Sequence, residues 1–462
     1  MPSVDPGAPV KTVKGAWWDS ERPELRASGE LRIAADGHIK LVLETIALRS
    51  AEELPGFEEK FESRTFWGHD QHGHAWSLFG CVWAGSQSSV ARVEHRRSVS
   101  HAVLGVHRAS LDEVQFDEIE VDFTDLQEWL CTPLLREREP RQPGAINVVV
   151  PPLDPREFPM KRGFTVALRP SVGGGSSYSE ISFTIRQALA LKFSTPATLR
   201  DLSEILLDLQ WFLTLGQGET VRVLEVTGLR QGVRLRGTDA PQIIEVFHRW
   251  AGGQAPRRSL HRHEMLFTAE DIGPQFGAML DRWHDYRQSH AAVLSCYFAT
   301  RFNESLYSNH AFLFLAHGLE LYHQLNFPGN RQAPDEFRAR LDAIVAAVPT
   351  EGKWLRERLA TANRLTLAER LRVLLEAKKD LIGGFIANPD QFVAAVKDTR
   401  NYYTHYDEKL KDSGRVASGV ALLKLIVQMQ GLLEACFLLD LGAPQKAISA
   451  VLKDGRTYVA AP

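Results

Sequence analysis

The chain has 462 residues, about three times the length of a usual single domain, so at least two folded domains are expected. Its 57 acidic residues nearly balance 54 basic ones, and a net charge of −3 argues against a protein that attracts nucleic acid through a global positive field. A hydrophobic share of 44% and a charged share of 24% exclude a disordered or fibrous chain. Any contact with RNA must therefore be local.

The cysteines and the amino terminus indicate a cytoplasmic protein. The cysteines are far apart and form no CxxC pair, so neither a disulfide framework nor a thiolate zinc site is predicted for Cys81, Cys131, Cys296 and Cys436. Scattered thiols fit a reducing cytosol. Residues 1–19 lack the continuous apolar core of a secretory signal.

Residues 420–441 come closest to a membrane span. Polar residues interrupt this apolar run at helical spacing, namely Lys424, Gln428, Gln430 and Glu434. The pattern favours a buried amphipathic helix, and no membrane partner is expected.

The region from Gly15 to about Val246 shows the short alternating runs of β-strands. Asp36-Gly37 favours a tight turn in a hairpin over 31–43, and a second hairpin is expected over 65–83. Further strands are predicted at 118–123, 145–150, 163–168, 181–185 and 221–226. One helix is predicted after Ser194-Thr195-Pro196, with an apolar stripe from Leu199 to Phe212. Gly173-Gly174-Gly175-Ser176-Ser177 is interpreted as a flexible hairpin connection.

After about Thr268 the hydrophobic period changes to that of a helix. Helices are expected at 272–300, 310–325, 335–348, 353–361, 367–379, 389–411 and 416–441. The start of the helix at 389 is clearly indicated, because Asn388 can cap its free backbone N–H groups and Pro389 fits its first turn. The fold class is therefore α+β and multidomain: a β-rich amino-terminal domain (1–270), a connecting helix (271–300) and an all-α helical bundle (301–462).

The segment from Lys397 to Asp407 gathers polar and aromatic residues between two apolar helices. At about 100° per residue, one helix places a guanidinium, an amide, a hydroxyl and an imidazole within a sector of roughly 140°. These groups belong to Arg400, Asn401, Thr404 and His405. They are predicted to line one cleft.

These residue types suit the internal cleavage of RNA, which requires removal of a 2′-hydroxyl proton, stabilisation of the phosphorane and protonation of the leaving oxygen. His405 can exchange protons near neutral pH, and Arg400 can hold a phosphate with two hydrogen bonds. Asn401 can orient the imidazole or the phosphate, while bases can stack on Tyr402, Tyr403 or Tyr406. No metal and no cofactor is required.

A single histidine cannot conveniently act as both base and acid in one turnover. Two copies of the motif facing each other across a two-fold axis would supply both groups. We therefore expect a homodimer.

The Arg-Asn-x-x-x-His segment, late in a helical domain and followed by a long apolar helix, resembles the R-x4-6-H signature of HEPN domains over residues 300–462. That resemblance implies a small helical bundle that usually dimerises. Many members of this family are metal-independent endoribonucleases whose arginine and histidine form the active site. Arg400 and His405 match those positions, and Asn401 matches the polar residue between them.

The whole chain resembles the ApeA-like group. Trp67-Gly68-His69 through Gly73-His74-Ala75-Trp76-Ser77-Leu78-Phe79-Gly80-Cys81 is similar to the hairpin of its β-rich amino-terminal domain, and Phe312-Leu313-Phe314-Leu315-Ala316-His317-Gly318-Leu319-Glu320 is similar to its early HEPN helix. The resemblance implies a sensor or regulatory domain, antiphage defence by abortive infection, a phage-derived trigger and RNA as substrate, with transfer RNA as one candidate.

Three features have competing interpretations. His69, His72 and His74 with Asp70 can be metal ligands or structural residues of a turn, and the turn is favoured. Glu320 can pair with Arg400 in support of the site, or remain a partly exposed helix carboxylate. Arg96-Arg97 can contact RNA phosphates or lie on solvated surface.

An alternative function belongs to a different class. In it, the helical domain is a non-catalytic HEPN module that binds nucleotide or a partner protein, and the β domain senses a ligand. A binding module has no need of both Arg400 and His405, so their presence favours the endoribonuclease.

Overall fold

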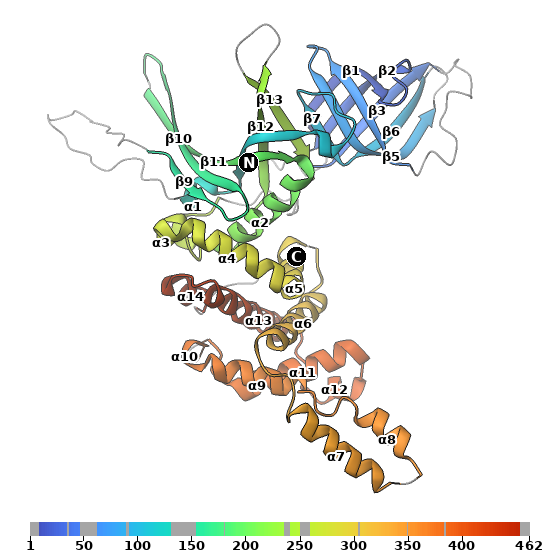
Figure 1. Cartoon of the computed structure of the whole chain (residues 1–462), viewed down its shortest axis with the longest axis vertical. Coiled ribbons are helices and arrows are strands. Elements are labelled where there is room, and N and C mark those ends of the chain that lie inside the picture. Colours follow the sequence, from blue (N-terminus) through green and yellow to red (C-terminus); the bar gives the residue numbers. More distant parts are fainter. Residues whose placement is uncertain are drawn as a thin grey trace, which may run out of the picture. The chain divides into compact units, whose positions relative to one another are not determined.

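The computed structural model describes residues 9–34, 37–46, 62–88, 92–130, 154–179, 181–234, 241–249, 259–303, 305–348, 350–382 and 385–452. The chain forms two compact units, Met1–Asp281 and Arg282–Pro462. The division falls inside helix α4 (Phe276–Ser289), more than three helical turns beyond the change in hydrophobic period near Thr268. The first unit is rich in strands and the second is helical (Figure 1), so the predicted fold class is confirmed.

A six-stranded antiparallel barrel forms the first part of the amino-terminal unit. Its strands are joined in the order β1-β2-β3-β6-β5-β4, and the β4–β1 pairing closes the ring. They are β1 (Pro9–Asp19), β2 (Arg26–Ala34), β3 (Ile39–Ile46), β4 (Arg64–Asp70), β5 (Ala75–Ser88) and β6 (Arg92–Val99). Both predicted hairpins are confirmed as β2–β3 and β4–β5.

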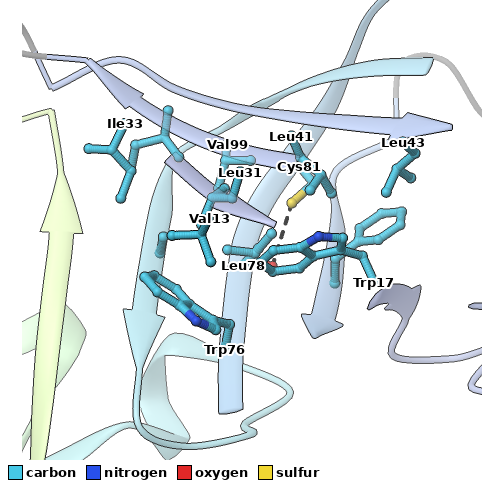
Figure 2. Packing of buried hydrophobic residues seen from close by; sticks show 13 residues of the cluster. Val13, Trp17, Leu31, Ile33, Leu41, Leu43, Trp76, Leu78, Cys81 and Val99 are labelled. Carbon is cyan, nitrogen blue, oxygen red and sulfur yellow. Dashed lines mark hydrogen bonds between the residues drawn. The ribbon is translucent and has the colours of Figure 1, made fainter. Parts of the chain in front are cut away.

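The barrel interior is filled by apolar side chains from alternate strand positions (Figure 2). Trp17, which is 0% exposed, lies edge-on to Trp76 with ring centroids 6.5 Å apart. Strand β5 shifts register against β4 between Leu78 and Cys81, where Gly80 has a φ of 62°. Such a bulge bends the strand, which lets β5 close the barrel and continue into the next part of the sheet.

The sheet extends beyond the barrel through β5 in the order β7-β13-β12-β8-β11-β10-β9, with every pairing antiparallel. These strands are β7 (His101–Leu104), β8 (Gln115–Phe123), β9 (Arg156–Pro159), β10 (Phe164–Ser176), β11 (Ile181–Thr198), β12 (Val223–Arg234) and β13 (Pro241–His248). The predicted strand at 145–150 lies outside the described residues.

In this region the structure confirms the predicted helix and contradicts the interpretation of the glycine run. The predicted helix is α2 (Leu199–Gln217), whose capping residue Thr198 accepts a hydrogen bond from the Asp201 backbone N–H. The glycine run was wrongly interpreted as a connection, because Gly173 to Gly175 pair with β11 inside strand β10. Cross-strand pairing satisfies their backbone groups, so glycine content alone did not identify the turn. Short helices α1 (Leu126–Leu130) and α3 (Ala269–Ile272) complete this unit.

Two stacked imidazoles join β7 to β13. His101 and His248 are paired across the strands, with ring centroids 3.9 Å apart and an interplanar angle of 6°. The His248 Nδ1–H donates to the Ser100 carbonyl at 2.7 Å. Burial, and then the charge of His248, lower the pKa of His101 from 6.5 to about 4.

This pair should make stability depend on pH. Between pH 6.5 and about 4 the unfolded chain binds more protons at His101 than the folded chain does, so the free energy of unfolding falls as pH falls through this window. With solvent screening at a partly exposed pair, we expect a loss of about 1–2 kcal/mol. Denaturant titrations at both ends of the window should show a smaller loss for His101→Phe; an equal loss would assign the effect to other groups.

The second unit contains α5 (Ala291–Phe302), α6 (Ser308–Asn326), α7 (Pro334–Ala346), α8 (Gly352–Leu359), α9 (Leu367–Ala377), α10 (Lys379–Ile382), α11 (Pro389–His405), α12 (Glu408–Asp412), α13 (Gly419–Asp440) and α14 (Gln445–Val451). The single helix expected over 272–300 was wrong, since α4 and α5 are separated at His290. The helix expected over 389–411 ends at His405. The short helices α10, α12 and α14 were not predicted.

Helix α13 is the core helix of this unit. It is long and apolar enough to cross a membrane, but 72% of its most apolar 18-residue window is buried inside the protein. The expectation of a buried helix is confirmed, although the helix has no continuous polar face. Gln430 and Glu434 are themselves buried, and the Glu434 carboxylate accepts hydrogen bonds from Tyr297 Oη at 2.6 Å and Gln430 Nε2 at 3.1 Å. Polar residues at helical spacing therefore mark an internal network here.

Candidate active site

Helix α11 carries the predicted active-site segment. The Asn388 side chain accepts a hydrogen bond from the Gln391 backbone N–H at 3.0 Å, and Pro389 occupies the first turn, which confirms the predicted start. Its buried face packs among α6, α9 and α13 through Phe392, Val393, Val396 and Thr399. The packed face fixes the rotation of the helix about its axis, and with it the direction of the residues after Thr399.

The carboxyl end of α11 is set by Tyr406. This residue has φ 52° and ψ 44°, and its backbone N–H donates to the Tyr402 carbonyl at 2.6 Å. Only Asp125 shares a positive φ among the non-glycine residues that the structure describes. Asp407 then caps α12 by accepting from the Lys409 N–H at 3.0 Å. His405 is consequently the last residue of its helix.

The four polar groups of the motif lie within the last two turns of α11. Arg400 and Asn401 are half-buried, and Arg400 Nη1 lies 3.5 Å from Asn401 Oδ1. Thr404 and His405 are exposed. The Thr404 hydroxyl donates to the Arg400 carbonyl at 2.7 Å, so it serves the helix backbone. No hydrogen bond or ion pair to any described residue occupies the His405 ring, which leaves both nitrogens available for proton exchange.

The three tyrosines have different surroundings. Tyr403 packs against Phe312 of α6 with ring centroids 6.1 Å apart, and burial raises its pKa. Tyr402 lies between Tyr403 and Tyr406, at 5.2 Å and 5.8 Å from their rings. Tyr406 is 63% exposed. Tyr406 is therefore the best placed of the three to stack on a base, and Tyr403 anchors the helix. A cleft shared by Arg400 and His405 remains a prediction.

Glu320 is paired with a different arginine from the one proposed. Its carboxylate lies 3.9 Å from Arg370 Nε, and its side chain is 24% exposed. Arg370 is a buried residue of α9, the helix that packs against α6. The hypothesis that Arg400 is the partner was therefore wrong, and the partly exposed carboxylate is the better description. Arg370 could not be identified as the partner from the sequence, because the pairing depends on how α6 and α9 pack.

Sequence reasoning also missed two buried polar residues directly before Arg400. The Thr399 hydroxyl accepts from the Ala417 backbone N–H at 2.9 Å. The Asp398 carboxylate contacts Lys397 Nζ at 3.1 Å and Arg415 Nε at 3.8 Å. Together they hold the segment before α13 against α11. A signal was present, since Thr399 continues the buried stripe at helical spacing.

The histidine-rich turn of the amino-terminal unit is structural, as the favoured interpretation held. One Asp70 carboxylate oxygen accepts from the backbone N–H groups of His72 and His74, both at 2.9 Å, and the other lies 2.9 Å from His74 Nδ1. This pattern closes the turn between β4 and β5. Within the described ranges, no group of three or more His, Cys, Asp or Glu side chains is arranged to hold a metal ion.

A β-rich unit followed by a helical unit with an Arg-x4-His helix end defines the class of protein. The family model for the ApeA N-terminal domain 1 matches residues 12–283, more than half of the chain, and the model for the Apea-like HEPN domain matches residues 313–447. The chain belongs to the ApeA-like HEPN family, a group of defence proteins whose HEPN domains generally have ribonuclease activity. No curated protein and no solved structure matches it.

Proposed function

We propose that the protein is a metal-independent endoribonuclease of antiphage defence, acting as a homodimer in the cytoplasm. The observation that carries the proposal is the end of α11, where the half-buried Arg400 and the exposed His405 lie on the last two turns of one helix. His405 transfers protons, Arg400 stabilises the charge on the phosphorane, and Asn401 orients one of them. Abortive infection through cleavage of RNA, transfer RNA included, is the biological outcome we propose.

The chemistry of the proposed reaction supports a dimer. Attack by the 2′-hydroxyl needs a base, and departure of the 5′-oxygen needs an acid. One α11 offers a single histidine, whereas two facing copies offer two. Arg400 and Tyr406 from each copy would then flank the same phosphate and its bases.

The test is an RNA-cleavage assay with the purified full chain in the presence of EDTA. We expect internal cleavage that leaves 2′,3′-cyclic phosphate ends, because the attacking group is the adjacent 2′-hydroxyl. The variant carrying both Arg400→Ala and His405→Ala serves as the control for contaminating nuclease. Absence of products above this control would instead favour the binding-module function, and 5′-phosphate ends would contradict the proposed chemistry.

A further inference from the structure

The polar face of α11 continues from His405 back along the helix. Lys397, Asn401 and His405 follow one another at intervals of four residues, so they form one stripe along the helix. Arg400 lies next to this stripe, one turn after Lys397. The Lys397 side chain is 45% exposed, so it reaches solvent on the same face as the half-buried Asn401 and the exposed His405. The surface available to a substrate therefore extends beyond the candidate active site.

Arg415, in the segment before α13, meets Lys397 at one carboxylate. Lys397 Nζ lies 3.1 Å from one Asp398 oxygen, and Arg415 Nε lies 3.8 Å from the other. The Arg415 Nε–H also donates to Ser413 Oγ at 3.0 Å. The Asp398 side chain is 6% exposed, whereas that of Arg415 is 59% exposed. A buried carboxylate thus holds two cations that both reach solvent.

The cations of this region outnumber its anions. Among the described residues, Asp398 is the one carboxylate within ion-pair distance of Lys397 or Arg415. Arg400 contacts only the neutral amide of Asn401, at 3.5 Å. Three cations and one anion therefore lie within about one turn of α11 and the segment beside it. This local excess of positive charge contrasts with the net charge of −3 for the whole chain, and it is the kind of local feature that contact with RNA requires.

The placement of the two cations suits a second phosphate of the same RNA strand. Lys397 precedes Arg400 by three residues, which corresponds to a rise of about 4.5 Å along the helix axis. Long cationic side chains can extend this separation to the distance between successive phosphates. The two Nη groups of Arg415 are bonded to no residue in the described ranges, so they can donate to two oxygens of one phosphate. With Arg400 on the scissile phosphate, the neighbouring phosphate would lie against Lys397 and Arg415.

We propose that Lys397 and Arg415 bind the phosphate next to the one that is cleaved, and so align the RNA strand along α11. The inference rests on the proposed nuclease function, because Arg400 is assigned there to the scissile phosphate. Lys397 supplies a point charge, and Arg415 supplies a planar pair of donors. Asp398 keeps the two cations close together before the RNA binds. The pair binds the substrate and takes no part in proton transfer, so its loss should raise KM and preserve kcat.

The salt dependence of RNA binding tests the pair. A short fluorescent 2′-O-methyl RNA has no free 2′-hydroxyl to attack the phosphate, so its binding to the purified full chain can be measured without cleavage. Fluorescence anisotropy gives the affinity over a range of salt concentrations. Lys397→Met and Arg415→Met should each weaken binding severalfold at low salt. The variant with both changes should lower the slope of log affinity against log salt by about 0.7, the contribution of one phosphate on a single strand.

Matched variants exclude a general effect of charge. Lys379 and Arg338 are exposed cations of the helical unit, and each pairs with a single carboxylate, as Lys397 does. Lys379→Met and Arg338→Met should leave both the affinity and the salt slope unchanged. Lys397→Arg keeps the positive charge and should retain the slope of the parent chain.

A purely structural role gives a different result. If Lys397 and Arg415 only stabilise the buried Asp398, their methionine variants should have a lower unfolding temperature and the salt slope of the parent chain. That result, or failure of the parent chain to bind the RNA, would overturn the inference. Should the double variant fail to fold, the two single variants carry the test, each with a smaller fall in slope.

Cleavage of unmodified RNA distinguishes this inference from the proposed function. With an active parent chain, the double variant should raise KM at least severalfold and keep kcat within about twofold. A fall in kcat with unchanged KM would contradict a binding role for the pair. If the parent chain cleaves no RNA but the double variant still lowers the salt slope, the nuclease function is rejected and the phosphate-binding pair is supported.

Discussion

The His405→Ala variant and the Arg400→Ala variant should each cleave RNA about a thousandfold more slowly than the parent chain, with little change in the free energy of unfolding. The catalytic loss follows from the roles proposed for them, since proton transfer and stabilisation of a developing phosphorane each contribute about 10²–10⁴ in rate. Stability should persist because His405 is exposed and bonded to no described residue, while Arg400 makes only a long contact to Asn401. Single-turnover cleavage and denaturant titration measure the two effects separately.

Matched variants sharpen this prediction. Arg400→Lys keeps the charge but loses the planar pair of donors, so we expect most of the activity to be lost. Arg372→Ala removes an exposed arginine of α9 that pairs with Asp390, and His317→Ala removes an exposed histidine of α6; both should cleave like the parent chain. Undiminished cleavage by purified His405→Ala would refute the assignment of that residue.

The sequence predicted elements best where local signals agreed with packing. The Asp36-Gly37 turn and the alternation on either side of it predicted the β2–β3 hairpin, and Asn388 with Pro389 predicted the start of α11. The end of α11 could not be predicted in this way. Tyrosine carries no preference for the left-handed region, so nothing in its residue type indicates a positive φ at Tyr406.

The burial of two charged side chains could not be predicted from the sequence either. Glu434 and Arg97 were interpreted from their residue types as polar-face and surface residues, yet both are buried. Strand alternation through Val99 contained the information for Arg97, but assigning a charged residue to a barrel interior requires knowledge of closure by β4 and β5. The partner of Glu320 likewise depended on the packing of α6 against α9.

The backbone of Tyr406 should control the activity of His405. Its left-handed conformation ends α11 directly after the histidine, and a β-branched residue adopts that conformation only with strain. We therefore expect Tyr406→Val to extend or fray the helix end, displace the imidazole and lower kcat by about tenfold to a hundredfold. Glycine accepts the same φ without strain, so Tyr406→Gly should keep kcat within a few fold of the parent value.

The Tyr406→Gly variant also distinguishes the contribution of the Tyr406 backbone from that of its ring. The exposed phenol is lost in both variants, so if Tyr406 stacks on a base, Tyr406→Gly should raise KM while kcat is preserved. Tyr406→Phe keeps the ring and should preserve KM. Steady-state cleavage of a short RNA by the three variants resolves these contributions, and an equal fall in kcat for glycine and valine would show that the ring acts in the chemical step. The geometry favours the backbone, because the Tyr406 N–H donates to the Tyr402 carbonyl at 2.6 Å and so closes the last helical turn, which ends at His405.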